Sequence, residues 1–412
     1  MSGVPLGYVH PKSGPRIPLS RDGDSLDHTA TPGSRRCSEP AQGGGGPSLA
    51  RRLPPRPAGR RQPAPDGRRR TGHGSRIPAG GARPRDRDGH RGEEDPPEEH
   101  EEHEEQAEER AKERAEERVY ALVAEDARRA CALLDPVFRS TDGMLGRVSV
   151  GVASGLASDA AALTDRARRL AESAGRPNVL IRVPVTSRGL VAVGDLLAAG
   201  IGVHLTSVFS VDRYAQAVDV YFRGLERATE DGLAASDVSS LVSLDVGRLS
   251  ARVDAHLDGT AAPSVTDALR GRAAAATARL VYRRYEESLG CPRWRELVAR
   301  GARPQRLLWT TDSPADAANP GNPAGISHLI AWMTLHALPQ PALEALALNQ
   351  HEGLHGDTLS GAHGAACAVL DALEQASVTV ESVARELEQA EHERELAVWD
   401  ELVTAVGAGS GA

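Results

Sequence analysis

The chain has 412 residues, enough for one to three domains, and a barrel alone could use most of that length. With 57 acidic and 49 basic residues the formal net charge is −8, which gives no overall case for binding nucleic acid or an anionic membrane. No apolar run approaches the ~20 residues needed to span a bilayer, and the first twenty residues lack the apolar stretch of a secretory signal. We therefore expect a cytoplasmic protein with no membrane partner.

Two segments of unusual composition come first. Residues 1–92 are rich in Gly, Pro and Arg, with thirteen Arg against three Asp in residues 51–92. Such a segment has too little apolar surface to offset chain entropy, so we predict disorder. No aromatic residues interleave with the arginines for base stacking, so no nucleic-acid partner is predicted. Residues 93–118 carry fourteen acids against four bases and are polar all round, which predicts a solvated helix or linker.

From Val119 onward, short apolar runs alternate with amphipathic helical patterns. A helix is expected over 119–138 with Leu122, Ala130, Leu133 and Leu134 on its apolar side. Six strands are predicted, over 147–154, 178–186, 201–210, 239–249, 305–311 and 326–338. Helices are predicted over 159–175 and 189–200, and another that Ser210 caps.

This alternation predicts an α/β fold of parallel βα units. The near-continuous apolar strands fit a sheet that is buried on both faces. No glycine-rich phosphate turn follows any strand, so a (β/α) barrel is favoured over a doubly wound sheet.

The strand and turn "NVLIRVPVTSRG" (178–189) contain a charged Arg182 in the middle of an apolar run. Together with "HLTSVFS", "SSLVSLDVGRL", "RPQRLLW" and "GDTLSG", this segment resembles the transaldolases, above all the long transaldolases of actinobacteria. The similarity extends over about residues 119–408. The resemblance implies a (β/α)8 TIM barrel with its site at the carboxyl ends of the strands. It also implies transfer of a dihydroxyacetone unit between sugar phosphates of the pentose phosphate pathway, with no cofactor.

The chemistry implied by the resemblance needs a strand lysine, which forms a Schiff base with the substrate ketone. Where the family reads a pattern like IKIPAT, this chain reads IRVPVT, so Arg182 stands at the lysine position. A guanidinium stays protonated and offers no free amine. The only lysines are Lys12 and Lys112, and none follows. The family acids in a pattern like SIEVD are Gly151 and Ala153 here, which removes the candidate general acid/base. We therefore predict impaired catalysis.

The resemblance assigns roles to five other residues. Thr206 falls on a threonine that positions water and substrate, and His204 on a neighbouring asparagine. Ser243 falls on a serine facing the sugar, and Arg248 on the arginine that holds the phosphate, a bidentate role. Thr311 lies near a further family serine. With Arg182, these residues are the candidate catalytic and substrate-binding site.

Purely structural roles are open for several of these residues. Thr206 and Ser243 could simply fill the barrel interior. Arg248 could form a structural ion pair. Arg182 could pair with Asp245, because an unpaired buried charge is expensive.

Three functions remain open at this point. The chain could be a transaldolase-type transferase, or a non-catalytic pseudoenzyme that binds or regulates through a sugar phosphate held by Arg248. Alternatively, Arg182 could polarise a carbonyl while His204 acts as base in an aldol or isomerase reaction.

The first two barrel strands of the family have no recognisable counterpart upstream of residue 119. Six strands cannot close an eight-stranded barrel without exposing edges, which predicts a homodimer or marginal stability. A frameshift upstream of about residue 95 is an alternative explanation of the Arg-rich composition. No metal site is predicted, and the role of His351, His355 and His363 stays open.

Overall fold

The computed structural model describes residues 97–311, 327–340, 343–344 and 356–409, with side chains described from residue 106 onward. The predicted disorder of residues 1–92 and the frameshift alternative lie outside these ranges. The chain divides into two compact units, and the architecture below belongs to the one that holds residues 104–412.

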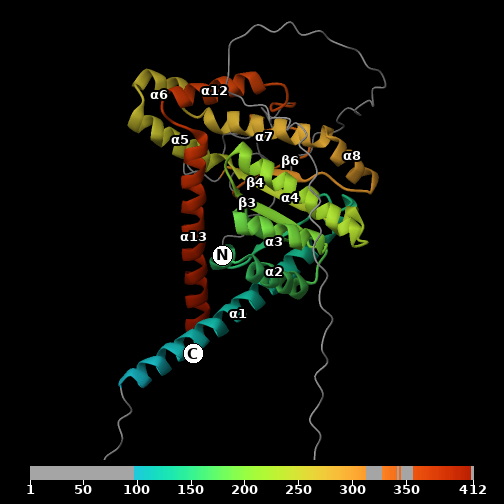
Figure 1. Cartoon of the computed structure of the whole chain (residues 1–412), viewed down its shortest axis with the longest axis vertical. Coiled ribbons are helices and arrows are strands. Elements are labelled where there is room, and N and C mark those ends of the chain that lie inside the picture. The colour runs from blue at the N-terminus through green and yellow to red at the C-terminus, as the bar shows by residue number, and fades with distance from the viewer. Residues whose placement is uncertain (1–96, 312–326, 341–342, 345–355, 410–412) are drawn as a thin grey trace, which may run out of the picture. The chain divides into compact units, whose positions relative to one another are not determined.

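Six parallel strands form one sheet in chain order. They are β1 (Val148–Gly151), β2 (Val179–Pro184), β3 (Val203–Val208), β4 (Ser240–Asp245), β5 (Arg306–Thr310) and β6 (Thr334–Ala337). Each lies within a predicted strand. β1 and β6 have one partner each, so the described strands form an incomplete (β/α) barrel, as predicted (Figure 1).

Helices connect and cover these strands. They are α1 (Pro97–Ser140), α2 (Ala160–Ala174), α3 (Ser187–Ala198), α4 (Val211–Glu230), α5 (Val246–Thr260), α6 (Pro263–Leu269), α7 (Ala273–Gly290), α8 (Pro292–Ala299), α12 (His363–Gln375) and α13 (Val380–Ala408), with 3-10 turns η1 (Ser154–Ser158) and η2 (Ala235–Asp237). The predicted cap is confirmed, since Ser210 Oγ accepts the backbone N–H of Arg213. No described helix is both long and apolar enough to cross a membrane.

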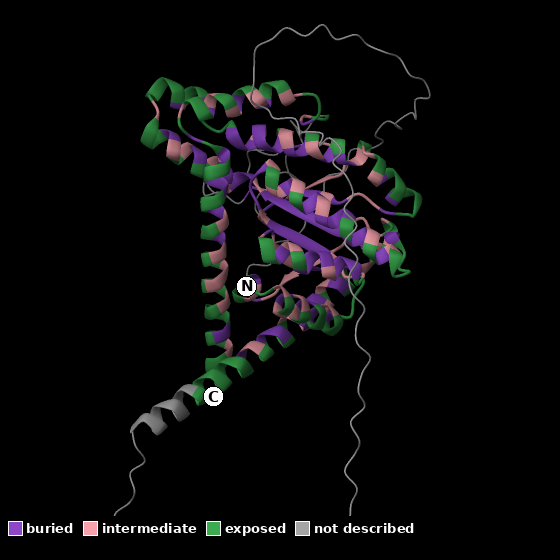
Figure 2. Ribbon diagram, viewed as in Figure 1, coloured by how far each residue is buried: buried purple, intermediate pink, exposed green. Residues whose placement is uncertain are grey.

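One face of the sheet packs against helices, and the other face carries the polar candidate residues. Ile181 and Val183 of β2 and Leu205 of β3 are fully buried under the surrounding helices (Figure 2). Because side chains alternate along a strand, Arg182 and His204 point to the opposite, inner face of the curled sheet. That alternation places the polar candidates together on one surface.

The apolar side predicted for the helix over 119–138 is wrong. Leu122 and Leu133 are 56% and 81% exposed, whereas Ala124, Ala127 and Cys131 are buried. These three small side chains recur every three to four residues, and two of them, Ala127 and Cys131, pack in a cluster with α2 and β2. Leu122 and Leu133 consequently face outward, whereas Leu134 is half-buried. α1 also runs unbroken through residue 119, so secondary structure marks no boundary there.

The strand predicted over 326–338 is shorter than expected. Only Thr334–Ala337 is extended, and Met333 immediately before it has a left-handed backbone with φ 63°. A continuous apolar run therefore includes a turn as well as a strand at this point.

Candidate functional site

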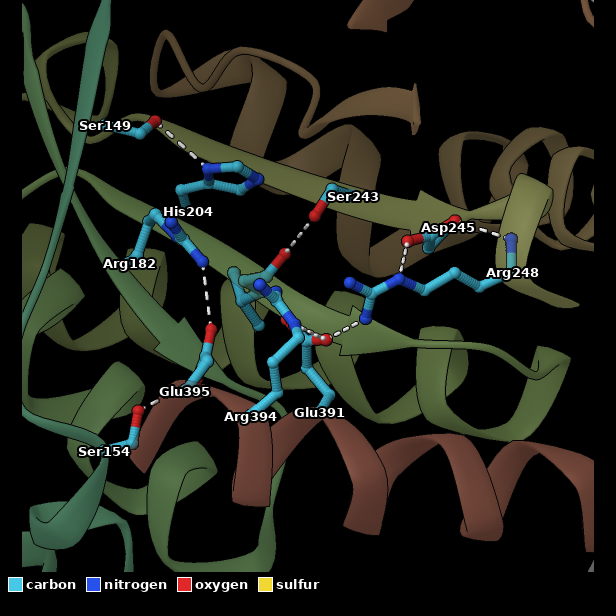
Figure 3. Close-up of polar contacts among 11 residues, drawn as sticks. Ser149, Ser154, Arg182, His204, Ser243, Asp245, Arg248, Glu391, Arg394 and Glu395 are labelled. Atoms are coloured by element: carbon cyan, nitrogen blue, oxygen red, sulfur yellow. Dashed lines mark hydrogen bonds and ion pairs between the residues drawn. The ribbon is translucent and has the colours of Figure 1, made fainter. Parts of the chain in front are cut away.

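The candidate site lies at the carboxyl ends of the strands, where α13 contacts β3, η1 and α5 (Figure 3). Gly151, Arg182 and His204 stand opposite one another in β1, β2 and β3. Ser243 lies on the same face of β4, two residues beyond the partner of His204. Arg248 follows in the first turn of α5.

Arg182 pairs with a residue that the sequence analysis missed. Its Nη2 atom donates to Glu395 Oε1 of α13 at 3.0 Å, and Glu395 Oε2 accepts from Ser154 Oγ at 3.0 Å. The Arg182 side chain is 40% exposed. The guanidinium is therefore neither unpaired nor sealed from solvent.

The predicted pairing of Arg182 with Asp245 is wrong. Asp245 caps α5 instead, because its Oδ1 atom accepts the backbone N–H of Arg248 at 2.9 Å. Its Oδ2 atom lies 3.3 Å from Arg248 Nε. A helix begins directly after β4, so this carboxylate faces the first turn of the helix rather than β2.

Arg248 forms the structural ion pair that was left open. Besides Asp245, it contacts the buried Glu391 of α13, which also accepts from Arg394 Nε at 3.1 Å. Burial raises the pKa of Glu391, but hydrogen bonds and charges from Arg394 and Arg248 outweigh it and leave that pKa below its usual value. The carboxylate is therefore ionised at neutral pH.

A third pair completes a pattern on α13. Arg213 in the first turn of α4 donates to both oxygens of Glu388, at 2.7 and 2.8 Å. Glu388, Glu391 and Glu395 follow at spacings of three and four residues, so they share one face of the helix. We call this row of three glutamates the acidic face of α13. It holds arginines from three different βα units.

His204 is buried and neutral. Its Nδ1 atom lies 3.0 Å from Ser149 Oγ, while Nε2 has no hydrogen-bond partner among the described residues. Burial, with the nearby charge of Arg182, lowers the pKa of His204 to about 3. A group with such a pKa is a weak base near neutrality, which argues against the alternative of an isomerase base.

The predicted hydroxyl residues lie near the same end of the sheet. Thr206 is buried, and the register of β3 shifts just after it, where Ser207 has φ 60°. Ser243 Oγ donates to the carbonyl of Leu205 at 3.4 Å, as a residue filling the interior would. Thr311 is buried directly after β5.

Space remains where the family acid would stand. A Cβ atom built on Gly151 meets nothing within 4 Å. The position therefore has room for a Cβ atom, in register with Arg182. Packing around that atom does not require a glycine here.

The described chain offers no lysine and no metal cluster at this site. Lys112 lies exposed on α1, with Nζ 3.6 Å from Asp400 Oδ1, and Lys12 lies outside the described residues. Within the described ranges no three His, Cys, Asp or Glu side chains group to hold a metal. His351 and His355 fall outside those ranges, and His363 begins α12.

Comparison with known proteins agrees with the fold. Residues 95–406 match the family model described as transaldolase/fructose-6-phosphate aldolase. A transaldolase of Acidothermus cellulolyticus is 41% identical over 286 residues, covering 69% of this chain and 76% of the relative. Transaldolases of Thermobifida fusca and Kocuria rhizophila are 38% and 36% identical, over 70% of this chain and 77% and 78% of the relatives.

Proposed function

We propose, from the premise that this chain belongs to the transaldolase/fructose-6-phosphate aldolase family, that it binds sugar phosphates without forming a Schiff base. The observation that carries the proposal is the side chain at the centre of β2. Arg182 projects into the mouth of the half-barrel and is held there by Glu395. An imine cannot form on a guanidinium, so a ketose phosphate bound here keeps its carbonyl and leaves unchanged.

The arginines at the mouth support recognition of a phosphate. Arg182, Arg213, Arg248 and Arg394 converge on the acidic face of α13. Guanidinium groups match phosphate oxygens by two parallel hydrogen bonds. In the free protein the glutamates satisfy these arginines, so an incoming phosphate competes with them.

The proposal also covers the metabolic pathway, the cell compartment and the oligomeric state. By family, we place the ligand among the sugar phosphates of the pentose phosphate pathway and the protein in the cytoplasm. β1 and β6 each have one strand partner among the described residues, and unpaired strand edges favour a homodimer. Light scattering on the full chain measures the mass directly, and a monomer at micromolar concentration would contradict this part.

Borohydride trapping tests the chemistry. Protein is mixed with fructose 6-phosphate, reduced, and weighed intact by mass spectrometry, while calorimetry measures binding separately. We expect the wild type to bind the sugar phosphate and gain no adduct. Arg182→Lys places an amine at the family position and is expected to gain one.

A matched control keeps the assay specific. Arg223→Lys introduces the same amine on the exposed surface of α4, where Arg223 pairs only with Asp219 among the residues described, and should gain no adduct. A covalent adduct on the wild type would refute the absence of Schiff-base chemistry. Failure of the wild type to bind fructose 6-phosphate would refute the binding role.

A further inference from the structure

A cavity of about 280 Å³ lies toward the amino ends of the strands, and the candidate site touches it only where Ser149 contacts His204. The inner face supplies Ser149, Leu180, Leu241 and Leu335, all near the amino ends of their strands. Because the strands are parallel, their amino ends meet at one edge of the sheet, away from the mouth that α13 covers. The cavity is therefore separate from the arginines discussed above.

Three other arginines line this cavity: Arg147, Arg303 and Arg306. Arg147 donates to the carbonyl of Gly143 at 2.9 Å and to Ser239 Oγ at 2.6 Å. It forms no ion pair with any described residue, whereas Arg303 pairs with the exposed Asp142. The Arg147 guanidinium also lies over the Phe138 ring, 5.0 Å from its centroid. These contacts offset part of the cost of burial, but the charge has no carboxylate partner among the described residues.

The charges around Arg147 also favour an anion in the cavity. Burial, together with the positive charges of Arg303 and Arg306, lowers the pKa of Arg147 to about 10. An anion in the cavity would relieve this repulsion. The three arginines lie at the end of the cavity where β1 and β5 begin.

The rest of the lining is apolar. Leu180 and Leu241 belong to a buried cluster on the inner face, and Leu134 and Val137 of α1 close the side. The volume is just under the ~300 Å³ at which small-molecule pockets begin. At roughly 30 Å³ for each water-sized group, it accommodates roughly ten non-hydrogen atoms.

We propose that this cavity, whose charge is concentrated at Arg147, binds a small organic anion with an apolar body, of the size of a medium-chain carboxylate. The carboxylate pairs with the guanidinium of Arg147 and the chain lies along Leu180 and Leu241. The site is independent of sugar-phosphate binding at the mouth, and no bond is made or broken in it.

Calorimetry on the full chain with octanoate tests the proposal. Octanol supplies the same chain without charge, and inorganic phosphate supplies charge without the chain. We expect octanoate to bind at least tenfold more tightly than either. Arg147→Met should weaken octanoate at least tenfold and leave octanol unchanged, because it removes the charge and keeps an apolar stem.

A second variant covers the case in which Arg147→Met fails to fold. Leu335→Trp, at a half-buried position of the edge strand β6, fills the cavity without removing charge and should abolish octanoate binding. Equal affinity for octanol and octanoate, or for phosphate and octanoate, would overturn the proposal. Octanoate binding that survives Leu335→Trp would also overturn it. So would a wild type that does not bind octanoate, as when a second copy of the chain covers the cavity.

Discussion

Glu391→Gln should make the protein less stable and, at the same time, a better binder of sugar phosphates. Glu391 is 9% exposed and carries the contacts to both Arg248 and Arg394. Removing one partner of a fully buried ion pair costs about 3–5 kcal/mol, and a surface pair is worth about 0–1 kcal/mol. The arginine side chains are 29% and 51% exposed, so the expected loss lies between these limits, at about 1–3 kcal/mol.

The same substitution removes one of the two carboxylates that pair with Arg248 and leaves Asp245. An incoming phosphate then has one carboxylate fewer to displace, and each 1.4 kcal/mol corresponds to about tenfold in affinity. We therefore expect fructose 6-phosphate to bind Glu391→Gln about tenfold more tightly than the wild type. A merely structural role of Glu391 would lower stability without raising affinity.

Urea unfolding and calorimetry measure the two effects, with Glu393→Gln as control. Glu393 lies on the same helix, is exposed, and among the residues that the structure describes bonds only to Gln389. Because the pKa of Glu391 in the folded state lies below its ordinary value of 4.5, its contribution to stability is present above pH 4.5 and is lost as the pH falls through the folded pKa. Equal stability of the two variants at pH 7, or weaker sugar-phosphate binding by Glu391→Gln, would refute the reasoning.

Two further substitutions test the inner face of the sheet. The Cβ atom of Gly151→Asp meets nothing within 4 Å, so we expect the free energy of unfolding to change by less than about 0.5 kcal/mol. Added to Arg182→Lys, it should raise dihydroxyacetone transfer above that of the single variant, and a double variant no faster than Arg182→Lys would contradict the proposed loss of an acid. His204→Asn should make the free energy of unfolding depend less on pH in the acid range. A histidine with a folded pKa of about 3 and an ordinary pKa of 6.5 destabilises the folded protein as the pH falls through that interval. Parallel pH profiles of urea unfolding for wild type and His204→Asn between pH 4 and 7 would count against this.

Much of the fold could be predicted because its signals are local. A strand buried on both faces is a continuous apolar run, and each of the six runs contains a strand. The helix predicted over 159–175 begins after Asp159, whose side chain caps it, and ends at Gly175 with φ 58°. The buried side of α1 was missed because small alanines, and not its leucines, make the close contact.

The partners at the site could not be predicted in this way. Arg182 and Glu395 lie 213 residues apart, and Arg248 and Glu391 lie 143 apart. The acidic face of α13 is one stripe of an otherwise highly charged helix, and no local pattern separates it from solvated glutamates. Only the packing of α13 across the ends of the strands selects it.

The packing of α13 gives Arg182 in β2 a structural role. A lysine in place of Arg182 would carry the same positive charge toward Glu395, but it would also carry an amine that can lose its proton. Arginine retains its charge at any physiological pH and presents a planar fork to the carboxylate, so it suits a permanent contact. Because Glu395 also accepts from Ser154 of η1, this contact joins β2 and α13 to the segment after β1. Arg182 thus supplies a structural link across the mouth of a barrel whose sheet, in the described residues, does not close.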